Sequence, residues 1–171
     1  MEVSNRIVIF SHGHLEQIGS PREVYEQPAN EFVARFIGVM NVLELEVRGG
    51  RARVAELEFP PHGHTEGQRL RIGFRPHAVQ ISSDRKAHRY GAVLRHAFFL
   101  GVMLRLELEL PSGLIIRARM SKEDYLRQGL AEGQEVSFQI GQYRVLAGAG
   151  GALTPEVATT HDLPVMLGEG I

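Results

Sequence analysis

The sequence predicts a mainly β protein in which a small barrel of oligomer-binding type follows a hairpin and two short helices. Three observations favour this fold class. From residue 41 onward, apolar residues recur at every second position in several short segments. Turns rich in glycine and proline separate these segments. A single short helical pattern stands among them, which argues against strands alternating with helices in a doubly wound sheet.

The first predicted strand is residues 6–10, RIVIF, whose consecutive apolar residues are typical of a strand covered on both faces. Residues 11–13 predict a turn, and residues 14–18, HLEQI, predict the second arm of a hairpin. An isolated hairpin is marginally stable in water. We therefore expect residues 6–10 to be disordered, or to pair with a substitute partner such as the same segment of another copy.

Two short helices follow the hairpin. Ser20 and Glu23 form a capping box around the start of the first helix, and Pro28 limits its length. Asn30 can cap the second helix, which Gly38 ends. The apolar face of this second helix consists of Phe32, Val33, Phe36 and Ile37.

The next strands are predicted at residues 43–54, with a hairpin turn at Gly49 and Gly50. The alternation changes phase at Ala55, which predicts a bulge. Residues 70–74 and 78–81 predict two further strands.

The longest strand pair is predicted at residues 93–110. Residues 111–113 turn the chain into another strand, Ser121 and Asp124 open a short helix, and the last strands are EVSFQI and YRVLA. The inward stripe of the longest pair is Val102, Leu104, Leu106, Leu108 and Leu110.

Composition excludes several classes of function. Lys plus Arg number 19 against 20 for Asp plus Glu, and this balance, with 7% aromatic residues, gives no reason to expect a nucleic-acid partner. The chain has no cysteine, which excludes disulfides, thiolate nucleophiles and Cys-ligated zinc. We expect no signal peptide, because Met1 is followed by mixed polar residues, and no run approaches the roughly 20 apolar residues of a membrane-spanning helix.

The first 38 residues, MEVSNRIVIFSHGHLEQIGSPREVYEQPANEFVARFIG, resemble the C-terminal end of the nucleotide-binding domain in ATP-binding subunits of bacterial ABC importers. The β-rich remainder resembles the transport-associated oligomer-binding (TOBE) region of those subunits, most clearly at residues 73–79, GFRPHAV. The histidine at position 77 resembles the residue that sulfate and thiosulfate importers have after the Arg-Pro pair. Importers of sugars or polyamines tend to have an acidic residue there. Asn5 departs from the family, which usually has Asp at this position.

The resemblance implies that residues 1–38 are the end of a truncated nucleotide-binding domain and residues 39–147 a TOBE-like barrel. Residues 148–171 have little periodicity and are expected to be a flexible tail. The resemblance also implies that the ATP and magnesium sites of the family lie before Met1, and no G-x-x-x-x-G-K-[ST] motif occurs in the sequence. We expect no catalytic, cofactor or metal site in the chain, and no ATP hydrolysis by it.

The resemblance further implies a regulatory role, a homodimer, and partnership with the nucleotide-binding domain and the permease subunits. The location would be cytoplasmic, peripheral to the inner membrane through the permease. A sugar, polyamine or iron importer is the alternative to a sulfate importer, and a stand-alone oxyanion-binding module is the alternative to a subunit fragment. A barrel for single-stranded nucleic acid is the third hypothesis.

A compact basic group at residues 69–77 supplies the candidate oxyanion or regulatory contact: Arg71, Arg75 and His77. Arginine can donate charge-assisted hydrogen bonds to a sulfate-like oxyanion. The alternative is that Arg75 pairs with an acidic neighbour on a strand.

Three other patterns have both a functional and a structural explanation. Residues 12–14 and 62–64 both read His-Gly-His, which suits a metal site or two turns, and turns are favoured because no carboxylate accompanies them. Residues 148–151 are glycine-rich but lack a following helix and lysine, so they do not predict a phosphate loop. The glutamates that alternate with leucines near residues 44 and 107 are expected to be the solvent faces of strands.

Overall fold

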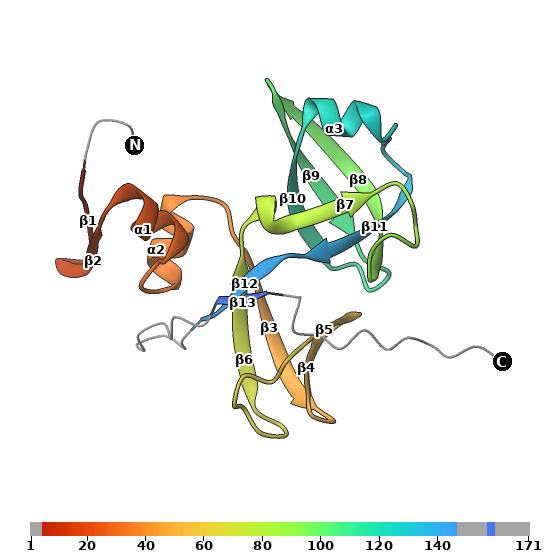
Figure 1. The fold of residues 1–171 in the computed structure, drawn as a ribbon. Coiled ribbons are helices and arrows are strands. Elements are labelled where there is room, and N and C mark those ends of the chain that lie inside the picture. Colours follow the sequence, from red (N-terminus) through yellow and green to blue (C-terminus); the bar gives the residue numbers. More distant parts are fainter. Residues whose placement is uncertain (1–4, 147–156, 160–171) are drawn as a thin grey trace.

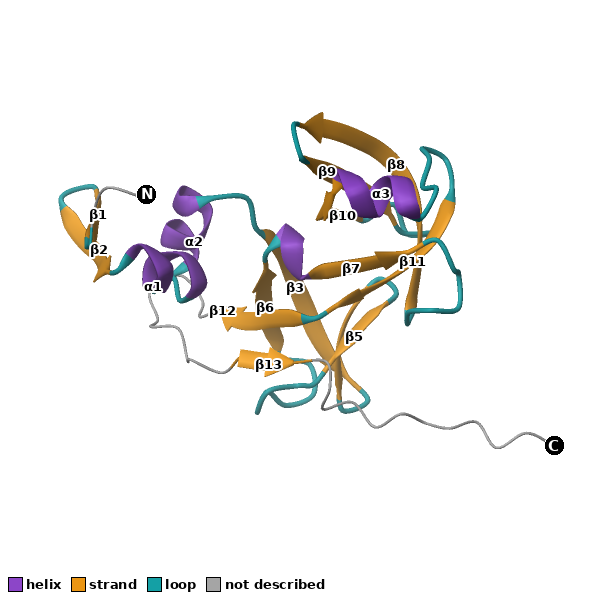
Figure 2. Ribbon diagram, turned by 45° about the horizontal axis from the view of Figure 1, so that its top comes forward, coloured by secondary structure: helices purple, strands orange, loops and turns teal. Residues whose placement is uncertain are grey.

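The computed structural model describes residues 5–146 and 157–159. At the N-terminal end of the chain, a two-stranded sheet is followed by two helices, and two larger curled sheets come after them (Figure 1). This confirms the predicted fold class, which is mainly β with a hairpin and two short helices in front. Figure 2 shows helices α1 and α2 beside the hairpin, and the third helix at the opposite end of the molecule.

The N-terminal segment folds around a small core of its own. Strands β1 (Ile7–Ser11) and β2 (His14–Gly19) pair in antiparallel fashion and lead into helices α1 (Pro21–Glu26) and α2 (Glu31–Ile37). Ile9 of β1 packs with Val24 and Val33 of the helices. The capping box at Ser20 and the cap at Asn30 are both present, as predicted.

Two predictions for residues 6–10 are wrong. The segment is neither disordered nor dependent on another copy for pairing, because β2 of the same chain supplies its ladder. Nor is it covered on both faces: Ile9 is buried, whereas Val8 and Phe10 on the other face are 48% and 63% exposed. The physical reason is that α1 and α2 cover one side of the hairpin.

The first large sheet has six strands in the order β13-β12-β6-β3-β4-β5. Its strands are β3 (Asn41–Arg48), β4 (Arg51–Val54), β5 (Leu57–Phe59), β6 (Arg69–Phe74), β12 (Gln142–Leu146) and β13 (Val157–Thr159). The second sheet has five strands in the order β10-β9-β8-β11-β7. Its strands are β7 (Val79–Ser82), β8 (Tyr90–Leu100), β9 (Met103–Glu109), β10 (Ile115–Ser121) and β11 (Glu135–Ile140).

The chain passes between the two sheets twice. β6 continues through the short 3-10 helix η1 (Pro76–Ala78) into β7, and β11 is followed after one residue by β12. Helix α3 (Lys122–Arg127) joins β10 to β11 and is capped by Ser121, as predicted. Asn41 adds a polar link, because its side chain donates to the carbonyl of Arg117 and accepts from the amide of Arg117, both at 2.8 Å.

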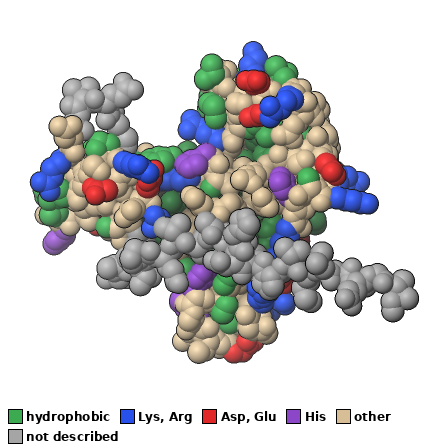
Figure 3. Space-filling model, viewed as in Figure 1, with side chains coloured by type: hydrophobic (Ala, Val, Ile, Leu, Met, Phe, Trp, Pro, Cys, Tyr) green, Lys and Arg blue, Asp and Glu red, His purple; other side chains and the backbone are tan. Residues whose placement is uncertain are grey.

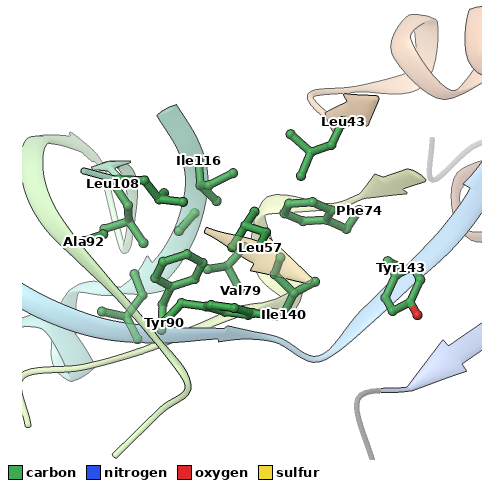
Figure 4. Packing of buried hydrophobic residues seen from close by; sticks show 14 of the residues in the cluster. Leu43, Leu57, Phe74, Val79, Tyr90, Ala92, Leu108, Ile116, Ile140 and Tyr143 are labelled. Atoms are coloured by element: carbon green, nitrogen blue, oxygen red, sulfur yellow. The ribbon is translucent and has the colours of Figure 1, made fainter. Parts of the chain in front are cut away.

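One hydrophobic core serves both sheets. Figure 4 shows Phe74 and Leu57 from the six-stranded sheet beside Val79, Tyr90 and Ile140 from the five-stranded sheet. Alternate residues of β3 and β9 supply this core, which is the pattern the sequence showed.

Two details of the predicted strands are corrected. Ala55 is not in a bulge: it has a positive φ of 51° in a two-residue turn between β4 and β5, and this turn restarts the apolar alternation at Leu57. Val102 is not part of the inward stripe. It lies in the turn between β8 and β9 and is 80% exposed, whereas Leu104 and the later members are buried.

The predicted tail at residues 148–171 falls mostly outside the described residues. Within it, Val157–Thr159 form β13, which pairs in antiparallel fashion with β12. None of the helices in the described part of the chain is long and apolar enough to span a bilayer.

Candidate functional site

The candidate site lies where helices α1 and α2 meet the β region. Figure 3 shows basic and histidine side chains at this junction, with acidic side chains beside them. All three residues predicted to contact an oxyanion are found here: Arg71 on β6, Arg75 immediately after it, and His77 on η1. The structure therefore brings the predicted residues to one region of the molecule.

Arg75 is the central residue of the junction, and its side chain is directed at the helices. The residue is 7% exposed. Its Nη1 donates to the carbonyls of Ala34 at 2.9 Å and Gly38 at 3.0 Å, and its Nη2 donates to the carbonyl of Tyr25 at 3.1 Å. A fourth contact, from Nη1 to the carbonyl of Val39, is 3.4 Å long.

These acceptors lie at the C-terminal ends of α1 and α2. The last carbonyls of a helix lack intrahelical partners and carry a partial negative charge, so a cation there is favourable. The guanidinium also lies over the ring of Tyr25, 4.4 Å from its centroid. Burial lowers the pKa of Arg75, yet an arginine remains charged in a protein. Arg75 thus links both helices to the end of β6 through hydrogen bonds.

Arg71 makes a second link between the same parts. Its Nη2 donates to Glu31 Oε1 at 3.0 Å, and Glu31 is the first residue of α2. Arg35, one turn later in α2, lies 2.8 Å from the same carboxylate. The alternative prediction that Arg75 pairs with an acidic strand neighbour is therefore wrong, since Arg71 has the carboxylate and Arg75 has backbone carbonyls.

His77 stacks on the helical segment. Its ring is 6.1 Å from that of Tyr25, with 18° between the planes. Burial lowers the pKa of His77, and the positive charges of Arg75 and Arg119 lower it further, while Glu26 acts in the opposite direction. The neutral imidazole is thus favoured at this position.

A cavity of about 400 Å³ adjoins the junction. Its lining includes Arg22, Glu26, Arg75, His77 and Arg144. Arg22 is paired with Glu26 at 2.9 Å, and the guanidinium of Arg75 is engaged by carbonyls as described. The arginines that sequence reasoning selected for an oxyanion therefore have protein partners.

Sequence reasoning missed a second basic pair, Arg105 on β9 and Arg119 on β10. The two residues are direct cross-strand partners and line a separate cavity of about 270 Å³, together with His77. The sequence contained a usable indication, because the turn was predicted at residues 111–113. Arg105 and Arg119 each lie seven residues from Ser112 at the centre of that turn, so a hairpin places them opposite each other.

The two His-Gly-His sequences lie in turns, as predicted. His12 and His62 both have φ of 48°, and each is followed by a glycine with positive φ. His62 Nε2 is 2.9 Å from the hydroxyl of Tyr143, a bond within the protein. Within residues 5–146 and 157–159, no group of three or more His, Cys, Asp or Glu side chains is placed to hold a metal ion.

Comparison with known proteins identifies the β region. Residues 72–147 match the TOBE domain family. The chain is 34% identical over 148 residues to the sulfate/thiosulfate import ATP-binding protein CysA of Methylococcus capsulatus, which covers 85% of this chain and 42% of that protein. It is 36% identical over 142 residues to the CysA of Nitrosomonas europaea, covering 80% of this chain and 39% of that protein.

A third relative, the CysA of Synechocystis, is 30% identical over 165 residues and matches 94% of this chain. The chain spans less than half the length of these relatives, 43% in the case of Synechocystis. Among solved structures, the cytoplasmic molybdate-binding protein ModG covers 64% of this chain and 79% of its own, with 17% identity and a TM-score of 0.42. That similarity is too low to carry an argument about function.

Proposed function

The chain belongs to the ATP-binding subunits of ABC importers, whose C-terminal, TOBE-containing region it resembles, and from this premise we propose that it is the regulatory and self-association region of such a subunit. The whole subunit would hydrolyse ATP with its nucleotide-binding domain and act with membrane permease subunits. The transported substrate would be sulfate or thiosulfate, a choice supported by the printed names of the relatives.

The observation that carries the proposal is the junction made by Arg75. A regulatory region can influence a nucleotide-binding domain only if the two are mechanically connected. Residues 1–38 resemble the end of that domain, and Arg75 holds both of its helices through carbonyls of Tyr25, Ala34 and Gly38. A rotation of the helices would therefore be transmitted to β6 and η1.

An uncovered apolar face supports the nucleotide-binding domain as a partner. On the hairpin, Val8, Phe10, Leu15 and Ile18 are 45% to 63% exposed. On α2, Phe32 and Phe36 stack on each other and are 40% and 67% exposed. Exposed apolar side chains clustered on the hairpin and on α2 mark interaction sites. We assign it to contact with the preceding part of the nucleotide-binding domain, at the cytoplasmic side of the inner membrane.

Self-association would raise the effective concentration of the two nucleotide-binding domains while they open and close. Light scattering of the purified chain tests it. We expect a concentration-dependent dimer, and a strict monomer at high micromolar concentration would contradict self-association.

A stand-alone oxyanion-binding module is the alternative. Its original site, Arg71 with Arg75 and His77, is not favoured, because Arg71 pairs with Glu31 and Arg75 binds helix carbonyls. An anion at that place would have to displace these contacts. The alternative needs a different set of donors.

A further inference from the structure

Most arginines of the described residues form an ion pair with a carboxylate, and among those that do not, two lie opposite each other on neighbouring strands. In the β9–β10 ladder, Arg117 lies opposite Glu107, with 3.9 Å between Arg117 Nε and Glu107 Oε1. One step along the same face, Arg119 lies opposite Arg105. Like charges directly opposite each other destabilise a sheet. Within the described residues, neither of these two arginines has an ion pair with a carboxylate.

Arg105 also has an unsatisfied donor. Its Nε is buried and has no hydrogen-bond partner within the part of the chain that the structure describes. Its guanidinium stacks over the ring of Phe98 from the next strand, 4.5 Å from the centroid, and this contact fixes its plane. The Nε atoms of Arg71 and Arg75 are buried and unpaired in the same way, so it is the register opposite Arg119 that distinguishes Arg105.

A cavity of about 270 Å³ adjoins this pair. It lies between the five-stranded sheet and the junction with α1 and α2. Besides Arg105, Arg119 and His77, its walls are mostly apolar and include Tyr25, Ile37, Val39 and Leu100. Apolar walls with a few convergent polar donors are typical of small-ligand sites, and the low dielectric of such walls strengthens an ionic contact.

We propose that Arg105 and Arg119 together bind a small oxyanion group in this cavity. The oxygens of the group would accept hydrogen bonds from both guanidiniums, and its negative charge would remove their mutual repulsion. A sulfate or phosphate ion and the carboxylate of a small organic acid share this chemistry. The like-charged register and the cavity then have one common explanation.

The groups around His77 make it a reporter of occupancy. Arg75 and Arg119 oppose its protonation, whereas Glu26 favours it, and the ring of Tyr25 stacks on it. An anion held by Arg119 would offset one of the two opposing charges. Binding should therefore raise the pKa of the His77 imidazole, a change that NMR can follow at the ring protons.

The site differs from Arg71 and Arg75, whose Nη groups bind Glu31 and helix carbonyls, although the Nε of each, like that of Arg105, has no hydrogen-bond partner among the described residues. Anion binding at Arg105 and Arg119 does not depend on the regulatory role proposed above; only the effect of that binding on transport does. Binding is measured on the isolated chain, so the two proposals fail separately. A dimer that binds no anion contradicts this site alone, and a monomer that binds one contradicts self-association alone.

The test is calorimetric titration of the full chain with sulfate, phosphate and benzoate, each at millimolar concentration and at ionic strength held constant with chloride. We expect at least one of the three to bind. Arg119→Ser and Arg105→Gln should each weaken that binding by about tenfold or more, as expected for loss of a charge-assisted contact. Binding of sulfate and phosphate but not benzoate would identify a free inorganic ion, and the reverse would identify an organic carboxylate.

The matched control is Arg117→Ser, which removes the same charge from the same face of β10. It should change affinity by no more than about twofold. The proposal is overturned if none of the three anions binds, or if Arg117→Ser weakens binding as much as Arg119→Ser, since that result would mean general electrostatics. Arg119 is exposed, so its variant should fold, and circular dichroism checks that Arg105→Gln does.

Discussion

Replacing Arg75 with methionine tests the junction between the N-terminal helices and the β region. Methionine keeps an apolar stem but removes the guanidinium, and with it three hydrogen bonds of 2.9 to 3.1 Å to the carbonyls of Ala34, Gly38 and Tyr25. The stacking over the Tyr25 ring is lost as well. The carbonyls at both helix ends would then lack their donor.

The size of the effect follows from these contacts. A hydrogen bond to a charged group contributes about 1.5–3 kcal/mol, and removing one partner of a buried ionic contact costs about 3–5 kcal/mol. Because three of the four acceptor contacts are only partly buried, water can satisfy some of the freed carbonyls. We expect a loss near 3 kcal/mol, concentrated in α1 and α2, because their core around Ile9 is separate from the main core.

Urea denaturation followed by far-ultraviolet circular dichroism gives the free energy of unfolding, and hydrogen exchange gives its location. Amides of α2, such as those of Val33 and Ala34, should lose protection while those of the β region keep theirs. Arg22→Met is the control, because Arg22 is in α1 but its ion pair with Glu26 is exposed and worth at most about 1 kcal/mol. A loss below about 1 kcal/mol for Arg75→Met, with unchanged protection of α2, would refute the reasoning.

Three further outcomes follow from single residues. The folded-state pKa of His77 lies below its ordinary value of about 6.5, so the unfolded chain binds the proton more tightly and the free energy of unfolding falls as pH drops below about 6.5. His77→Gln should reduce this loss, and identical urea midpoints for both chains at every pH would contradict it. Asn41→Ala removes both bonds to the Arg117 backbone and should cost about 2–4 kcal/mol in urea denaturation, whereas a loss within about 0.5 kcal/mol would mean that the link between the sheets is unimportant. A Cβ at position 73 would lie 2.8 Å from the sulfur of Met40, so Gly73→Val should lower stability by about 1–3 kcal/mol. Gly91→Ala is the control, because no atom lies within 4 Å of the added Cβ. Equal losses for both variants would argue against crowding at position 73.

Local patterns predicted the elements well because their causes are local. The capping box at Ser20 and the caps at Asn30 and Ser121 depend on residues three positions away, so the sequence alone contains the interaction. Alternating apolar residues likewise predicted most of the strands. The errors at Ala55 and Val102 occurred in two-residue turns, where alternation continues in the sequence although the chain reverses direction.

The role of Arg75 could not be predicted in this way. Its acceptors are backbone carbonyls 36 to 50 positions earlier in the chain, and a carbonyl has no side-chain identity to recognise in a sequence. The basic group at residues 71–77 was found, but its partners depend on how α1 and α2 pack on β6. The Arg105 and Arg119 pair was within reach, because hairpin register follows from the turn at Ser112.

The most direct test of the account is a transport measurement with a chimera. The region of the Methylococcus capsulatus relative that matches this chain would be replaced by the chain itself, and sulfate uptake would be measured in cells lacking their own ATP-binding subunit. We predict that the chimera supports uptake, and that Arg75→Met lowers uptake more than Arg22→Met does. A folded chimera that hydrolyses ATP but supports no uptake of sulfate or thiosulfate would contradict the proposed role.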